Sequence, residues 1–392
     1  MSIRLPSADS LREGGGGVTS MTAPASLVPG KSTMRRVVVW VLIFTCVLAE
    51  TPANDLPWIE VSREKSGFIT NPGGKLFAPW GFNYDHDAEG RLIEDYWEAE
   101  WSAVERHFGE MKNFGANVVR VHLQLSRFME GPDKPNGKSL ARLSKLIALA
   151  ERVRLYLDLT GLGCYHKKDV PEWYDSLSEQ GRWRAQAAFW QAVAKKAANS
   201  SAVFCFDLMN EPVVPGGKRV ERDWLGPPFG DKHFVQFITL DQAGRPRPDI
   251  ARAWIQYLTS AIRTVDQRHL ITVGMVDWSL DRPGLTSGFV PDRVSADLDF
   301  LCVHIYPERG KTREALATLK GFNVGKPVVV EETFPLKCSS NELLEFMNAA
   351  GQDAAGWISF YWGKPPDELR RSNAIGDAIL RDWLEVFRKR AP

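Results

Sequence analysis

The chain is poor in the residues that define several classes of protein. It has only 5 cysteines in 392 residues, and their spacing fits neither a disulfide scaffold nor a zinc motif. Its formal net charge is +1, from 49 basic and 48 acidic residues. It therefore lacks the basic field of a nucleic-acid-binding protein, and we expect no nucleic-acid partner. With 25% charged residues, it also lacks the bias of a disordered or low-complexity chain.

Long apolar runs are almost absent, and the one exception lies near the N-terminus. Val37–Ala49 is apolar except for Thr45 and follows Arg35 and Arg36. A basic start, a short apolar stretch and small residues at its end are typical of a secretory signal peptide. A membrane span needs about 20 apolar residues, so we expect no stable membrane insertion.

The N-terminal pattern predicts three segments. We expect a disordered or upstream extension over 1–33, a signal peptide over 34–49, and one secreted or periplasmic domain over 50–392. A lipoprotein signal at Cys46 is one alternative. A misassigned start that precedes a buried strand is another.

Aromatic residues, by contrast, are abundant. The chain has 14 Trp, 20 Phe and 8 Tyr, which suits a large core or a cleft that stacks sugar-like ligands. Short apolar runs alternate with amphipathic helical runs after residue 55, and Trp58–Val61 and Phe68–Thr70 read as a preceding hairpin. Eight runs read as buried parallel strands: Phe77–Asn83, Asn117–Leu123, Leu155–Thr160, Val203–Met209, Leu270–Met275, Phe300–Ile305, Val328–Glu331 and Ala355–Tyr361.

Helical patterns follow all but one of these strands, which predicts an α/β fold: a single (β/α)8 TIM barrel after a short N-terminal β-hairpin. The fifth unit is the weak one, because residues 277–299 are loop-like. The long connection 213–249 should lie on the catalytic rim, where loops shape the substrate cleft.

Carboxylates end two of the predicted strands. Residues 204–212 read FCFDLMNEP, and Pro212 stops strand pairing after Asn210 and Glu211. Residues 326–334 read KPVVVEETF, an apolar strand that ends in Glu331 and Glu332. A barrel brings the C-terminal ends of all its strands to one face, so these carboxylates can meet. Hydrolysis of a glycosidic bond needs such a pair, one protonated and one ionised.

At these residues the chain resembles glycoside hydrolases of clan A, and most of all family 5, which contains cellulases and β-mannanases. The matching stretches run from Trp80-Gly81-Phe82-Asn83 to Trp362. The resemblance implies that Glu211 is the general acid/base and that Asn210 binds the sugar 2-hydroxyl. It favours Glu332 as the nucleophile, although Glu331 stays possible because Thr333 precedes the aromatic residue. Neighbours on a strand point to opposite sides, so we expect Glu331 to turn outward and to pair with a basic group or reach solvent.

Other strand ends supply candidate substrate-binding residues. Arg120 and His122 share one side of a strand, so both can point inward. The resemblance implies that Arg120 lies under the nucleophile, where its charge would keep that carboxylate ionised. The resemblance implies that His304 lines the cleft near the acid/base and that Tyr306 hydrogen-bonds the nucleophile. It also implies an aromatic sugar platform at Trp362, and it includes Asn83 at the end of the first strand.

The sequence therefore predicts a secreted, retaining β-glycoside hydrolase that acts on β-linked glucan, mannan or a related oligo- or polysaccharide by double displacement. We expect a monomer that needs no metal and no organic cofactor. One alternative is a transglycosylase on the same site, with Trp224 as a candidate acceptor platform. Another is a catalytically silent carbohydrate-binding barrel, which would not require the two carboxylates.

Overall fold

A computed structural model describes residues 56–282 and 284–392. The expected extension and signal peptide thus lie outside the described residues. The described part opens with a small antiparallel sheet of β1 (Trp58–Val61), β2 (Phe68–Asn71) and β3 (Leu76–Phe77). The Phe68 ring packs edge-on against Phe204 and Phe300, with centroids 5.2 and 5.1 Å away. Both partners lie at the N-terminal ends of barrel strands, so the predicted hairpin covers the bottom of the barrel.

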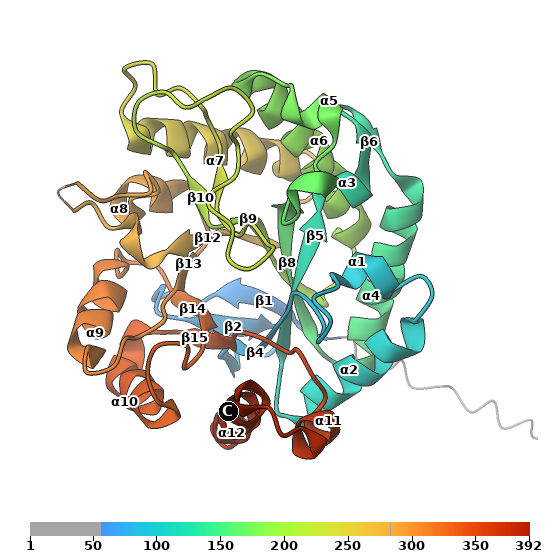
Figure 1. Cartoon of the computed structure of the whole chain (residues 1–392), viewed down its shortest axis with the longest axis vertical. Coiled ribbons are helices and arrows are strands. Elements are labelled where there is room, and N and C mark those ends of the chain that lie inside the picture. Colours follow the sequence, from blue (N-terminus) through green and yellow to red (C-terminus); the bar gives the residue numbers. More distant parts are fainter. Residues whose placement is uncertain (1–55, 283) are drawn as a thin grey trace, which may run out of the picture. The chain divides into compact units, whose positions relative to one another are not determined.

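Eight parallel strands form a closed barrel (Figure 1). In chain order they are β4 (Trp80–Tyr84), β5 (Val118–Gln124), β8 (Tyr156–Gly163), β9 (Val203–Asn210), β12 (Leu270–Val276), β13 (Leu301–His304), β14 (Val328–Thr333) and β15 (Gly356–Ser359). Every residue of these strands is buried, as expected for parallel strands covered on both faces. The predicted (β/α)8 barrel is confirmed.

Helices surround the barrel (Figure 1). The longer ones are α2 (Trp101–Asn113), α4 (Gly137–Val153), α6 (Glu179–Ala197), α7 (Arg247–Arg263), α9 (Thr312–Gly321), α10 (Ser340–Ala350) and α12 (Ile375–Arg388). In α2 the buried residues are Val104, His107, Phe108 and Met111, the three-to-four spacing of one helix face. The fifth unit has only the four-residue α8 (Pro291–Val294), in keeping with its loop-like sequence.

The first barrel strand begins later than its apolar run predicts. Phe77 belongs to β3, and the barrel strand starts at Trp80. Pro79 separates the two because it has no N–H to donate to a neighbouring strand. Its carbonyl still accepts a hydrogen bond from the Trp357 N–H at 2.8 Å. Across residues 56–282 and 284–392, we find no helix with the length and apolar character to span a bilayer.

Candidate active site

Glu211 stands directly after β9, at the C-terminal mouth of the barrel. Its backbone is left-handed, with φ of +44°, a conformation that costs a non-glycine residue about 1–3 kcal/mol. Hydrogen bonds hold it there: its N–H donates to Gly274 O at 2.9 Å and its carbonyl accepts from Gln236 N at 3.3 Å. Pro212 then begins the short strand β10 (Pro212–Val213), which pairs with β11 (Gln236–Phe237). Backbone contacts therefore aim the Glu211 side chain.

The end of β14 carries both Glu331 and Glu332 into the barrel. Val303 of β13 pairs with Val330, but the next residue, His304, pairs with Glu332, so the register skips Glu331. A bulge of this kind breaks the strict alternation of side chains along a strand. The expectation that Glu331 turns outward is therefore wrong: its side chain is fully buried, with Oε2 3.4 Å from Arg120 Nη2.

Glu332 is held by two donors. Arg120 Nη1 donates to its Oε1 at 2.6 Å, and the Tyr306 hydroxyl donates to its Oε2 at 2.7 Å. Burial raises the pKa of the Glu332 carboxyl, and the neighbouring His304 and Arg120 counteract that effect. The residue is 5% exposed. These contacts orient one carboxylate and leave it facing Glu211.

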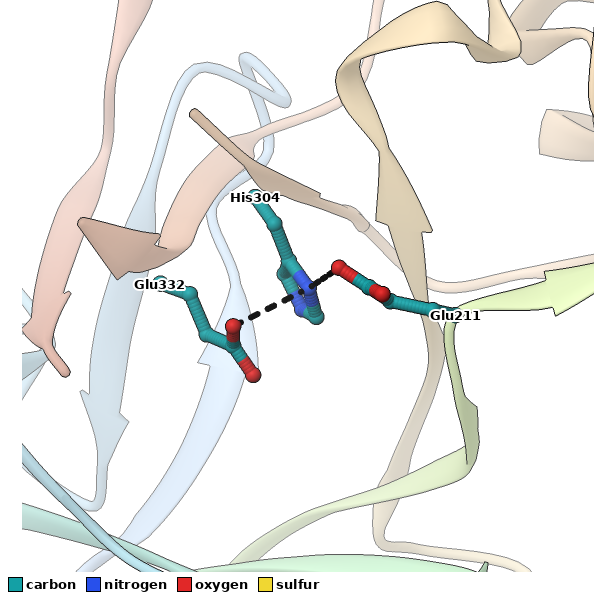
Figure 2. A group of neighbouring side chains, drawn as sticks. All are labelled: Glu211, His304 and Glu332. Atoms are coloured by element: carbon teal, nitrogen blue, oxygen red, sulfur yellow. Dashed lines mark hydrogen bonds and ion pairs between the residues drawn. The ribbon is translucent and has the colours of Figure 1, made fainter. Parts of the chain in front are cut away.

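His304 lies between the two carboxylates (Figure 2). Its Nδ1 donates to Glu211 Oε1 at 2.9 Å and is 3.4 Å from Glu332 Oε2. Its Nε2 is 3.3 Å from Glu331 Oε2. Burial lowers the pKa of His304, but these three carboxylates outweigh it and raise the pKa to about 10. One oxygen of Glu211 and one of Glu332 lie within 4.8 Å of each other.

Arg120 is the centre of the hydrogen-bond network under the mouth. It is fully buried, and it also donates to Asn83 Oδ1 at 2.9 Å, to Asp207 Oδ2 at 2.7 Å and to Asn210 Oδ1 at 3.0 Å. The surrounding carboxylates raise the pKa of Arg120 in spite of its burial. Asn83 and Asn210 thus lie in the site as expected, with their amide oxygens bound to the guanidinium.

His122 is inward-facing and buried, as its strand position predicts. Its Nε2 is 3.2 Å from Asn83 Oδ1, and its Nδ1 contacts the Tyr165 hydroxyl. Burial and the neighbouring Arg120 lower the pKa of His122 to about 3, so the ring is neutral. Tyr165, which follows β8, is a further residue of the site, and it was not predicted from the sequence. Its hydroxyl lies among the polar groups of the site, but no local motif marks it.

Two further carboxylates, Asp158 and Asp207, were also missed. Both are almost completely buried, and one oxygen of each lies within 4.8 Å of the other and of Glu331. Their signal in the sequence is an acidic residue inside an otherwise apolar strand, in LYLDLT and FCFDLM. Such a residue is costly unless it is paired.

The structure does not bring Trp362 to the mouth. It is 1% exposed and packs against Phe82 and Phe114, with ring centroids 5.2 and 5.7 Å away. The half-buried Phe360 lies nearer the site, 6.3 Å from the Tyr306 ring. Trp224 is buried too, and its indole N–H donates to Asp175 O at 3.1 Å. Neither tryptophan presents a face that could stack on a sugar.

Within residues 56–282 and 284–392, two side-chain groups have the donor atoms to hold a metal ion: Glu211, His304 and Glu332, and Asp158, Asp207 and Glu331. In each group the carboxylates already contact a positively charged side chain. His304 lies among the first group, and Arg120 contacts two members of the second. The site therefore consists of two carboxylates in contact with an arginine, a histidine and a tyrosine. This arrangement suits acid–base and nucleophilic chemistry.

Several known proteins with a similar sequence have names that describe an action on mannan. Mannan endo-1,4-beta-mannosidase A of Emericella nidulans is 23% identical over 237 residues, covering 53% of this chain and 54% of that protein. Its counterpart in Podospora anserina is 23% identical over 286 residues, covering 67% of this chain and 62% of that protein. The chain thus spans little more than half the length of these relatives.

Solved structures share the fold. An exo-beta-1,4-mannosidase from an Opitutaceae bacterium superposes with a TM-score of 0.63 at 17% identity, covering 84% of this chain and 62% of that one. An endo-1,4-beta-mannanase from Rhizomucor miehei gives 0.58 at 18% identity, covering 85% of this chain and 100% of that one. The model of the family described as cellulase (glycosyl hydrolase family 5) matches residues 84–364. The match includes the strand ends that carry Arg120, Glu211, His304 and Glu332, and the chain belongs to glycosyl hydrolase family 5.

Proposed function

We propose that this chain is a retaining β-glycoside hydrolase that cleaves β-linked mannan by double displacement. The observation that carries the proposal is the pair Glu211 and Glu332, whose nearest oxygens lie within 4.8 Å. Retaining enzymes hold their two carboxyl groups about 5–5.5 Å apart, and inverting enzymes about 6.5–9.5 Å apart. The close approach of the two carboxylates fits the retaining arrangement better than the inverting one, which supports a covalent route.

The contacts of the two residues suit different roles. Glu332 attacks the anomeric carbon, because Arg120 and Tyr306 each donate to one of its oxygens and so favour the ionised, oriented form. Glu211 protonates the leaving oxygen and then takes a proton from the water that releases the sugar. His304 contacts both carboxylates and helps to hold them at this separation.

The relatives support mannan as the substrate. Those found by sequence are mannan endo-β-mannosidases by name, and the superposed structures supply the shared fold. We infer that β-mannan, rather than β-glucan, is the better substrate.

The buried acids imply that one proton is stored beneath the site. Both oxygens of Asp207 accept donors, Arg120 Nη2 and the Gly274 N–H, each at 2.7 Å. Neither oxygen of Asp158 accepts one from the described residues, and Glu331 Oε1 also has no donor. A proton on Asp158, donated to Glu331, satisfies both groups. Burial and the adjacent Glu331 raise the pKa of Asp158 well above its usual range.

The substrate proposal predicts a clear preference in a panel of soluble β-glycans. Purified protein should release reducing sugar from β-1,4-mannan or mannan oligosaccharides with kcat/KM about tenfold or more above that for β-1,4-glucan, a discrimination within the reach of sugar-hydroxyl contacts. Equal rates on both, or a preference for glucan, would refute the mannan assignment.

Glu332→Ala should lower kcat by about 10⁴-fold or more, since the covalent step is lost. Azide added with an aryl β-mannoside should restore turnover by entering the vacated space and give the α-mannosyl azide. The matched control is Glu331→Ala, which should lose activity through a displaced Arg120 but show no azide rescue. Rescue in the Glu331 variant alone would reverse the assignment.

Asp158→Asn should raise the free energy of unfolding at pH 7.5, with the gain shrinking toward pH 4. A carboxyl that is neutral when folded and ionised when unfolded takes up a proton on folding, so stability falls as pH rises above its ordinary pKa. Asparagine removes that cost, worth about 1.4 kcal/mol per pKa unit. Denaturant unfolding at both pH values measures it. The pKa of Asp207 is also raised, to about 7, but Asp207→Asn removes the charged partner of the buried Arg120, and that loss should outweigh the gain, so this variant should be destabilised. Equal destabilisation by both variants at pH 7.5 would disprove the stored proton.

Export through the pattern at residues 34–49 is part of the proposal. N-terminal sequencing of protein recovered from the medium or periplasm should find a start near Glu50. Recovery of the protein only from the cytoplasm, with Met1 or Met34 retained, would disprove it.

A further inference from the structure

The two halves of a bound substrate lie on different sides of the carboxylate pair, if the proposed function holds. Glu211 must reach the leaving oxygen, so the leaving half lies on its side of the mouth. A hollow is present there, lined by Glu211, Val235, Asp277, Trp278 and Lys337 among others. The retained sugar lies on the opposite side, over the ends of β4, β5 and β15.

A segment of the long β9–α7 connection, which we call the mouth strap (residues 226–236), ends beside the hollow, which Val235 lines, and its residues 232–234 cover part of the opposite side. The connection, drawn in yellow-green, returns toward the middle of the barrel (Figure 1). The strap is closed at its base by a hydrogen bond from Gly226 N to Val235 O at 2.8 Å. It is attached to the loop after β8, because His233 N donates to Tyr165 O at 2.8 Å. The strap therefore extends from the fourth strand of the barrel to the third.

Lys232 connects the strap to the turn that follows β4, the first strand of the barrel. Its side chain is only 7% exposed, and its Nζ lies 3.2 Å from Asp231 Oδ1. A Cβ at Gly90, where φ is +78°, would lie 3.2 Å from that Nζ. The lysine stem thus fills the space between the strap and the turn, and a lysine is rarely this buried unless packing holds it.

Aromatic rings complete the closed side. The Phe234 ring of the strap lies 5.3 Å from Tyr165 and 6.4 Å from Phe360. The His86 ring, after β4, stacks on Tyr361, after β15, at 4.2 Å and 25°. Asp85 fixes that imidazole through a 2.7 Å contact to its Nδ1. Rings from four connections thus line one edge of the mouth, and each is positioned by a neighbour.

We infer that the site is closed beyond the retained sugar, so that the enzyme removes a terminal sugar from the non-reducing end of a β-mannan chain. An enzyme that cuts internally must let the chain continue past the retained sugar. Here the strap, Lys232 and the His86–Tyr361 stack occupy that path. The hollow beside Glu211 leaves the other direction open, where the rest of the chain extends.

The test is a time course on borohydride-reduced mannohexaose, whose reducing end is marked. Terminal cleavage yields mannose and reduced mannopentaose as the first products, and the viscosity of soluble mannan falls little for each bond cut. Early mannotriose with reduced mannotriose would overturn the inference. An aryl β-mannoside run in parallel separates the two proposals. Failure to turn over any of these β-mannosides would refute the proposed function itself, whereas turnover with internal products would refute only the terminal specificity.

Variants of the strap sharpen the test. Phe234→Ala and Lys232→Ala each remove a filled part of the closed side and should raise the ratio of internal to terminal cleavage by about tenfold, the scale of a pocket contact. Phe229→Ala is the matched control, because Phe229 belongs to the same strap and is 72% exposed. Its product pattern should equal that of the unaltered protein. If neither Phe234→Ala nor Lys232→Ala changed the product pattern, these residues would not close the site.

Discussion

The Arg120 guanidinium, buried at the centre of the barrel mouth, organises the catalytic end of this molecule. It donates hydrogen bonds to Asn83 of β4, to Asp207 and Asn210 of β9, and to Glu332 of β14. Burying a charge is costly unless its partners surround it, so these side chains and the arginine stabilise one another. A barrel whose strands shifted by one residue would separate them, and the network therefore fixes both the register of the strands and the orientation of the nucleophile.

Three carboxylates, those of Asp207, Glu331 and Glu332, contact the single positive charge of Arg120. This excess of acidic groups explains several local features. Gly274 faces the network, and a Cβ there would lie 2.9 Å from Arg120 Nη2 and 3.0 Å from Glu331 Oε2. Glycine is thus the only residue that leaves the guanidinium its place. Burial and the adjacent Glu331 raise the pKa of Asp207 to about 7, whereas Arg120 and His304 overcome burial and lower the pKa of Glu331 to about 2. The hydrogen-bond donors and cations around each carboxyl group therefore set its pKa, and two neighbouring carboxyl groups differ in protonation state.

The sequence predicted the fold well because most residues of the barrel strands are apolar, and these runs can be recognised without knowledge of the tertiary contacts. It also placed Glu211, Arg120, His304 and Tyr306, because each falls at the end of such a strand. It failed where the backbone departs from alternation: the bulge at Glu331 is set by pairing with β13 and β15, which no local pattern reveals. It also misplaced Trp362, because a strand end alone does not say whether a ring points to the core or to the mouth.

Closure of the barrel limits when a newly synthesised chain can finish folding. The last barrel strand pairs with the first, with Trp357 opposite Trp80, and Phe387 of the final helix stacks on Trp80 at 4.1 Å. Contacts between such distant positions form late, because a long loop must close first. A nascent chain therefore cannot close the barrel until β15 has emerged. Until then β4 and β14 keep open edges with which another chain can pair, so closure protects the protein from aggregation as well as completing its site.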